Sequence, residues 1–189
     1  MIPGVHIYID GVIKDGDKVV RKVRRQKGHS FVKQFSQYLL ASFGYCLVSI
    51  KDITAASKTK LVSNPRITIN VNGSSGNASH GLVVGSSAAG VAITDYYVNT
   101  LIQHGITAGK LSYSANIIGA PTSDATSNYF IITRVFTNGS GGNVSVNELG
   151  LCGYDGSYYY CFARDVLAST IVLANGQNLT LNYTIKATI

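Results

Sequence analysis

Two charged residues of opposite sign form the pair in this chain that most suggests chemistry. Arg134 lies in an apolar segment at 128–137, and Glu148 lies in a second one at 143–154. The Gly/Ser-rich connection at 138–143 predicts a hairpin, which would place Arg134 nearly opposite Glu148. A carboxylate beside a guanidinium can act as a catalytic acid or base with a clamp. A cross-strand ion pair more often fixes register, at below about 1 kcal/mol when exposed, so we interpret Arg134 and Glu148 as a structural pair.

Two cysteines are the second candidate for chemistry. A two-residue turn at 156–157 predicts a hairpin of the glycine-first type. Its register places Tyr154 opposite Tyr159 and Cys152 opposite Cys161. Directly opposed strand positions strain a disulfide, and the sequence places no histidine or lysine beside either cysteine to activate it. We therefore interpret the two as small buried thiols.

No metal or phosphate site is indicated by the remaining motifs. A glycine segment at 105–110 resembles a phosphate-binding loop, but only three residues separate its glycines and Leu111 stands where Ser or Thr must reach the metal. It predicts a turn. The histidines have no metal-ligand spacing; they are His6, His29, His80 and His104. We expect no metal, no cofactor and no enzymatic activity.

Charge is distributed very unevenly along the chain. Residues 1–66 hold 12 Lys/Arg and 4 Asp/Glu, whereas residues 67–189 hold only 4 Lys/Arg and 5 Asp/Glu. Charged residues make up 13% of the chain, about half the usual share. Such a low charge density indicates a surface that is covered by copies of the same chain or by other proteins.

The basic N-terminal region is the candidate for partner docking. Three explanations stay open for it, namely an acidic protein partner, a solvated face and a nucleic acid. A nucleic acid is disfavoured because the aromatic residues that would stack on bases lie in the following helix and are expected to be buried. The candidate docking residues are Arg21, Lys22, Arg24, Arg25, Lys27 and Lys33.

Short apolar segments separated by turn residues predict a mainly β chain, an antiparallel β-sandwich of jelly-roll or immunoglobulin-like type. A basic N-terminal hairpin or arm with one short amphipathic helix (1–50) and a polar connection (51–80) precede the sandwich module (81–189). The helix is expected from Ser30 to Phe43, a one- or two-turn helix at 94–102, a turn at 10–11 and an exposed loop at 72–80. Strands are expected at 5–10, 12–14, 18–23, 66–71, 82–85, 111–118, 128–137, 143–154, 158–165 and 178–189.

Several of these segments together resemble small virion structural proteins of tailed bacteriophages. The resemblance implies a β-sandwich component of the phage particle that is repeated around a symmetric assembly. It carries over no catalytic or binding residues. The matching segments are SFVKQF (30–35), GLVVG (81–85), VAITDY (91–96), LIQHG (101–105), ITRVFTN (132–138), ELGL (148–151), FARDVL (162–167) and ANGQNLTLNYT (174–184), running on to Ile189.

From the resemblance and the composition we expect a non-enzymatic structural subunit of the tail, collar/neck or baseplate. It would be made in the host cytoplasm, reside in the virion and bind copies of itself and other virion proteins, with no membrane partner because no stretch of 18 apolar residues occurs. The alternatives are a capsid decoration (cement) protein and a receptor- or carbohydrate-binding module. The last would show Tyr96, Tyr97 or Tyr113 exposed beside an Asp or Asn. Tyr158, Tyr159 and Tyr160 are candidate contact anchors.

Overall fold

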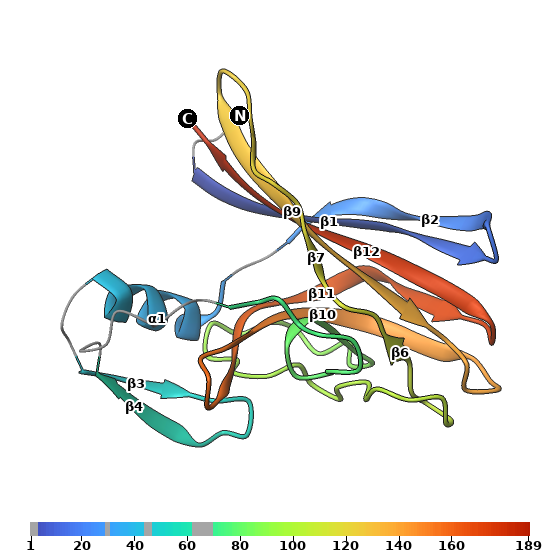
Figure 1. The fold of residues 1–189 in the computed structure, drawn as a ribbon, viewed down its shortest axis with the longest axis horizontal. Coiled ribbons are helices and arrows are strands. Elements are labelled where there is room, and N and C mark those ends of the chain that lie inside the picture. The colour runs from blue at the N-terminus through green and yellow to red at the C-terminus, as the bar shows by residue number, and fades with distance from the viewer. Residues whose placement is uncertain (1–3, 29–30, 44–46, 62–69) are drawn as a thin grey trace.

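The computed structural model describes residues 4–28, 31–43, 47–61 and 70–189, and these form a mainly β protein (Figure 1). The predicted fold class is confirmed. The strands and the helix are β1 (Gly4–Asp15), β2 (Lys18–Lys27), α1 (Lys33–Phe43), β3 (Leu47–Lys51), β4 (Ser57–Leu61), β5 (Gly81–Gly85), β6 (Ser112–Tyr113), β7 (Ile117–Ile118), β8 (Thr122–Ser123), β9 (Ser127–Thr137), β10 (Val144–Tyr154), β11 (Tyr159–Leu173) and β12 (Gln177–Thr188).

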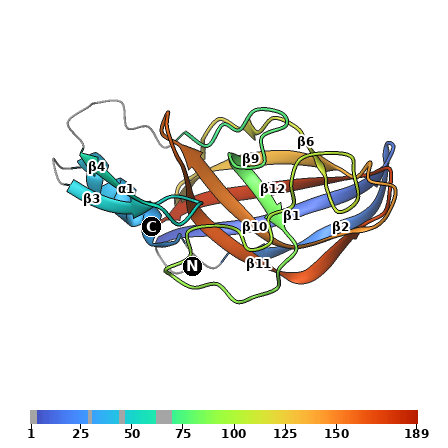
Figure 2. The ribbon, with the colours of Figure 1, turned by 90° about the horizontal axis from the view of Figure 1, so that it is seen from below.

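Two antiparallel sheets pack face to face, as Figures 1 and 2 show. The larger sheet has the order β2-β1-β12-β9-β6, and the short strands β7 and β8 also pair with β9. The smaller sheet has the order β11-β10-β5, and β3 and β4 form a separate hairpin beside α1. Apolar residues from both sheets meet in one core, which is what a sandwich requires.

The N-terminal segment is part of the larger sheet and not a detached arm. Ile7, Ile9 and Ile13 alternate toward the core, and β1 pairs with β12 along its whole length. The turn expected at 10–11 is therefore wrong, because the chain stays extended there. A side chain at Gly11 would clash with the carbonyl oxygen of Thr180, so this glycine allows close strand packing.

One expected hairpin is confirmed and one is wrong. Strands β10 and β11 pair with Tyr154 opposite Tyr159 and Cys152 opposite Cys161. Strands β9 and β10 belong to different sheets, so residues 138–143 cross from one sheet to the other. A flexible six-residue connection permits either arrangement, and the sequence alone did not distinguish them.

The short helix expected at 94–102 is also wrong. This segment is irregular, and its backbone groups bond to β5 in place of a helical ladder. The amide of Ile102 donates to the carbonyl oxygen of Val84 at 2.9 Å, and the amide of Ser86 donates to Thr100 at 3.1 Å. The core positions of Val98 and Ile102 are thus filled by a loop.

Helix α1 begins at Lys33, and the predicted burial of its aromatic stripe is confirmed only in part, because Phe35 and Leu39 are half-buried. Tyr38 and Ala41 are buried and pack with residues of β3 and β11, namely Val48, Ile50, Tyr160 and Phe162. This second, smaller core attaches the helix and the β3–β4 hairpin to one end of the sandwich (Figure 1). The strand expected at 66–71 falls mostly on residues outside the described ranges; within them Asn70 forms a single bridge with Tyr154.

Candidate docking surface and buried charges

Five of the six candidate docking residues lie together on one strand. β2 is the edge of the larger sheet, and Arg21, Lys22, Arg24, Arg25 and Lys27 on it are all exposed. The sixth, Lys33, is exposed at the start of α1, at the opposite end of the molecule from the β1–β2 turn (Figure 1). The structure thus concentrates the basic character of the N-terminal region on a single edge strand.

Cations project from both faces of this strand. Lys22 lies opposite Val12 on the outer face, whereas Arg21 lies opposite the buried Ile13 on the inner face. The guanidinium of Arg25 lies 4.4 Å from the centre of the Tyr8 ring, a cation–π contact. Two register shifts between β1 and β2 bend the strand. Bulges and like charges both oppose pairing of β2 with the same strand of another copy.

The predicted cross-strand pair of Arg134 and Glu148 is wrong, because their strands lie in different sheets. Arg134 on β9 is 1% exposed, and its guanidinium donates to backbone carbonyl oxygens only. These belong to Ser114 (2.8 Å), His80 (2.7 Å), Leu82 (2.7 Å), Ser74 (2.9 Å) and Asn77 (2.9 Å). All five N–H donors of the side chain are thereby used.

Arg134 acts as a clamp on the loop that leads into β5. Four of its five acceptors lie between residues 74 and 82, so the loop expected to be exposed at 72–80 is in part buried and held against β9. The Tyr113 ring stacks on the guanidinium at 4.8 Å. Burial lowers the pKa of Arg134 to about 10, which leaves the side chain charged at neutral pH.

Glu148 has a different partner, Arg164 of the neighbouring strand β11. Glu148 and Arg164 are both 0% exposed, and Nε of Arg164 donates to Oε2 of Glu148 at 2.7 Å. Nη1 of the same guanidinium lies 2.7 Å from Oδ2 of Asp95. The carbonyl oxygens of Ala89 and Gly90 accept the remaining bonds. The result is a buried Glu–Arg–Asp network.

The Glu148 end of this network is closely packed. Burial raises the pKa of Glu148, while the hydrogen bond and the charge of Arg164 oppose that rise. A side chain at Gly85 would come within 2.5 Å of Oε1 of Glu148 and 2.6 Å of the Asn99 carbonyl oxygen. The carboxylate is therefore enclosed by packed backbone, and the arrangement is suited to joining the 86–102 loop to the smaller sheet.

Cys152 and Cys161 are neighbouring free thiols, both buried. A hydrogen bond to Cys152, together with burial, raises the pKa of Cys161. A thiol that stays protonated is a poor nucleophile. This geometry supports the interpretation of the pair as packing residues.

Of the tyrosines that would favour a carbohydrate site, Tyr113 is buried and Tyr97 is exposed. Tyr113 is buried in the core, and its hydroxyl donates to the carbonyl oxygen of Ile102 at 2.5 Å. Tyr97 is 38% exposed, but the nearby Asp95 carboxylate accepts from Arg164 and from the Ala92 amide. Among the proposed contact anchors, Tyr160 is buried.

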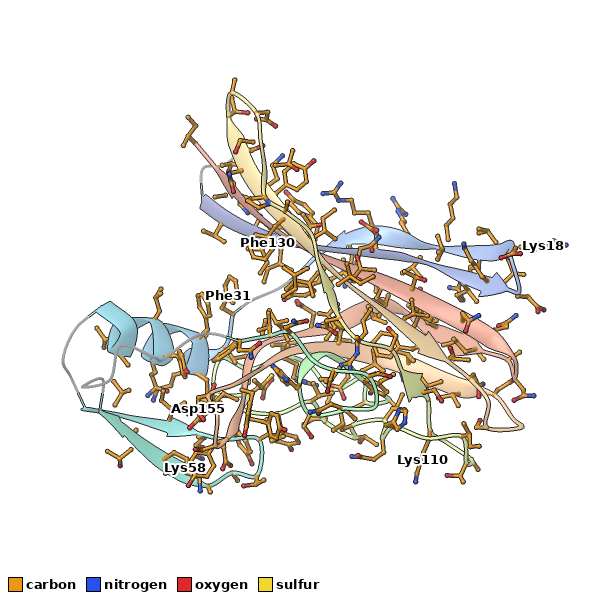
Figure 3. The ribbon with its side chains drawn as sticks, viewed as in Figure 1. Lys18, Phe31, Lys58, Lys110, Phe130 and Asp155 are labelled. Atoms are coloured by element: carbon orange, nitrogen blue, oxygen red, sulfur yellow. The ribbon has the colours of Figure 1, made fainter. Side chains whose placement is uncertain are left out.

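An apolar groove separates α1 from the end of the larger sheet. Phe31 and Phe130 face each other across it in Figure 3. Its volume is about 580 Å³, and it has no ionisable lining residue. The groove can pack against apolar groups but offers no catalytic chemistry; it is lined by Val5, Phe31, Phe35, Leu39, Val71, Ile118, Phe130, Ile132, Leu151, Phe162 and Ile185.

His80 and His104 serve packing and hydrogen bonding. His80 is buried with Nε2 at 2.8 Å from the Asn70 carbonyl oxygen, and Nδ1 of His104 accepts from the Tyr113 amide at 3.1 Å. Within the part of the chain that the structure describes, no group of three or more His, Cys, Asp or Glu side chains is placed to hold a metal ion.

Sequence reasoning missed Arg164 because of one extra residue in β11. A hairpin register counted from the 156–157 turn places Arg164 opposite Leu149, on the other face from Glu148. A bulge between Leu151 and Cys152 shifts the register, so that Arg164 lies opposite Gly150 and shares a face with Glu148. Arg164 is two positions from Val166, the cross-strand neighbour of Glu148. An arginine at such a diagonal position is the sequence signal that could have predicted this ion pair.

Comparisons with protein-family models, with curated proteins and with solved structures return no match to this chain. In the described ranges, no helix has the length and apolar character needed to cross a membrane.

Proposed function

We propose that the chain is a non-enzymatic structural subunit of a tailed-phage particle, in the tail, collar/neck or baseplate, and that it docks through β2. The observation that carries the proposal is the row of five exposed cations on one edge strand. An edge strand that rejects its own copy by like charge favours a foreign acidic surface.

The rest of the molecule supports a role in assembly. Residues 67–189 have only nine ionisable Lys, Arg, Asp and Glu side chains, and four of these are buried, namely Arg134, Glu148, Arg164 and Asp165. The surface of this long part is therefore nearly uncharged outside a few positions. Low charge lowers the desolvation cost of covering a surface with neighbouring subunits.

The proposal is tested on particles released by the bacterial host that carries the gene. Particles are purified on a density gradient, and the chain is quantified by mass spectrometry against the major capsid protein. We expect several copies per particle at a fixed ratio. A chain that stays in the soluble fraction while intact particles form would overturn the proposal.

The docking role of β2 is tested in the same preparation. We expect the triple variant Arg21→Gln, Arg24→Gln, Arg25→Gln to fold, because these side chains are exposed, and to be lost from particles. The matched control removes three cations elsewhere, Lys51→Gln, Lys110→Gln and Lys186→Gln, and should be incorporated normally. Equal incorporation of both variants would contradict docking through β2.

A further inference from the structure

The outer edges of the two sheets face each other and enclose a small cleft. β2 ends the larger sheet and β11 ends the smaller one, so neither strand has a ladder partner on its outer side among the described strands. The cleft between them has a volume of about 260 Å³. Its lining residues are Arg21, Lys22, Val23, Arg24, Gln26, Leu167, Ala168, Ser169 and Ile171.

Gln26 closes one end of this cleft. Its Nε2 donates to the carbonyl oxygen of Val166 at 3.0 Å, and its Oε1 accepts from the amide of Ala168 at 2.7 Å. These bonds join the edges of β2 and β11 at a single point. Ala168 belongs to a bulge of β11, in which residues 167–170 lie away from β10 because Glu148 pairs with Val166 and Val146 pairs with Ile171.

The cleft has three cations and no carboxylate in its lining. Arg21, Lys22 and Arg24 are all exposed. Two acids on these sheets have hydrogen-bond partners elsewhere: Asp10 on β1 accepts from Asn182, and Asp165 on β11 accepts from the Tyr183 hydroxyl. The concentrated positive charge is thus left for a group from another molecule.

We infer that this cleft binds an extended acidic segment of a partner protein, with its Asp or Glu carboxylates on Arg21 and Arg24. The inference rests on the proposed docking role of β2 and specifies the partner. An extended peptide matches the site because its backbone can pair with a free strand edge while alternate side chains enter the cleft. Arginine forks are suited to carboxylates.

A nucleic acid matches the same site less well. The apolar lining residues are Val, Leu, Ala and Ile, so the cleft has no aromatic ring on which a base can stack. Tyr8 lies on the outer face of the sheet and is already covered by Arg25. A second copy of this chain is disfavoured too, because its sequence has nine acids spread over 189 residues and no acidic run.

The test measures binding of fluorescein-labelled hexaglutamate to the full chain by fluorescence anisotropy. The hexaglutamate part of the probe is extended by its own charge repulsion and, apart from the dye, has no aromatic group. We expect the dissociation constant to rise at least tenfold in the double variant Arg21→Gln, Arg24→Gln. The control Lys14→Gln, Lys186→Gln removes two cations from the outer face of the same sheet and should change it by less than threefold.

Three results would overturn the inference. They are the absence of hexaglutamate binding, an equal loss in both double variants, and tighter binding of a thymidine oligonucleotide of the same charge through Arg21 and Arg24. Thermal melts of both variants check that the fold is intact. If the peptide does not bind but the chain is incorporated normally into particles, the peptide-binding inference is contradicted and the proposed function is not. If the peptide binds but the chain is not incorporated, the proposed function is contradicted and the peptide-binding inference is not.

Discussion

Two arginines in the described part of the chain are buried, and their charges are compensated in different ways. Arg134 in the larger sheet has neutral partners only, five backbone carbonyl oxygens. Arg164 in the smaller sheet has two carboxylates, Glu148 and Asp95, and two carbonyl oxygens. Both are almost fully buried, so the difference lies in what compensates the buried charge.

The comparison separates geometry from charge. The five N–H groups of Arg134 hold the loop before β5, because the carbonyl oxygens of that loop would lose a hydrogen-bond donor without them. Opposite charge is what holds Glu148 inside the smaller sheet, since a buried carboxylate without a counter-ion is strongly unfavourable. The first site requires the shape of arginine, whereas the second requires chiefly its charge.

The largest effect is expected from removal of the charge at the second site. Arg164→Met leaves the Glu148 carboxylate buried without its cation and should lower the free energy of unfolding by about 3–5 kcal/mol. Urea denaturation measures this. The double variant Arg164→Met, Glu148→Met should recover most of the loss, and Lys18→Met at the exposed hairpin turn is the control. If the double variant is no more stable than Arg164→Met alone, the unpaired charge of Glu148 is not the cause of the lost stability.

The next effect separates shape from charge directly. Arg134→Lys keeps the charge but has three donors for five carbonyl oxygens, and we expect a loss of about 3 kcal/mol, since a hydrogen bond to a charged group contributes about 1.5–3 kcal/mol. Arg164→Lys should cost clearly less, because an ammonium can still neutralise Glu148. Urea denaturation of the two lysine variants makes the comparison. Equal losses of unfolding free energy in the two variants would contradict the proposed difference between the two sites.

A smaller effect is expected from crowding the second site. Gly85→Ala pushes a methyl group against Glu148 and the Asn99 carbonyl oxygen and should cost about 1–3 kcal/mol. Gly90→Ala is the matched control, because a methyl group there meets no atom within 4 Å. Thermal unfolding of both variants is the measurement. If Gly85→Ala leaves the unfolding temperature unchanged, Glu148 can move aside, which would contradict the enclosed network.

The smallest effect is a difference in pH response. Burial lowers the pKa of His80 from its ordinary value of 6.5, and the charge of Arg134 also lowers it. As pH falls below 6.5, His80 binds a proton in the unfolded chain but stays neutral in the folded chain. The free energy of unfolding therefore decreases as the pH falls from 6.5 to the lower pKa of folded His80. We expect His80→Gln to reduce this acid-side loss, measured by urea denaturation between pH 7 and pH 5.5.

The network around Arg164 should respond in the other direction. Because burial raises the pKa of Glu148, the folded chain keeps a proton that the unfolded chain releases, and stability falls as pH rises from the ordinary value of 4.5 through the folded pKa. Glu148→Gln should remove this part of the pH dependence of stability. His6→Gln is the control for the His80→Gln variant. An unchanged pH profile in both His80→Gln and Glu148→Gln would contradict the assignment.

Local patterns were enough to predict much of the fold. Alternation in β1, the aromatic stripe of α1 and the two-residue turn between β10 and β11 depend only on neighbours in sequence. The opposed cysteines followed from that turn because a short loop fixes register. The helix expected at 94–102 failed because backbone bonds to Val84 replaced the helical ones, a tertiary effect that local propensity does not contain.

The sequence by itself determined a β-rich chain with its cations concentrated near the N-terminus and its body poor in charge. Only the tertiary structure decided which charges meet. The 138–143 connection crosses between sheets, which separates Arg134 from Glu148, and one bulged residue in β11 turns Arg164 toward Glu148. Because strand side chains alternate between faces, a single residue of register reverses which groups are buried together, and that residue is set by packing of the whole sheet.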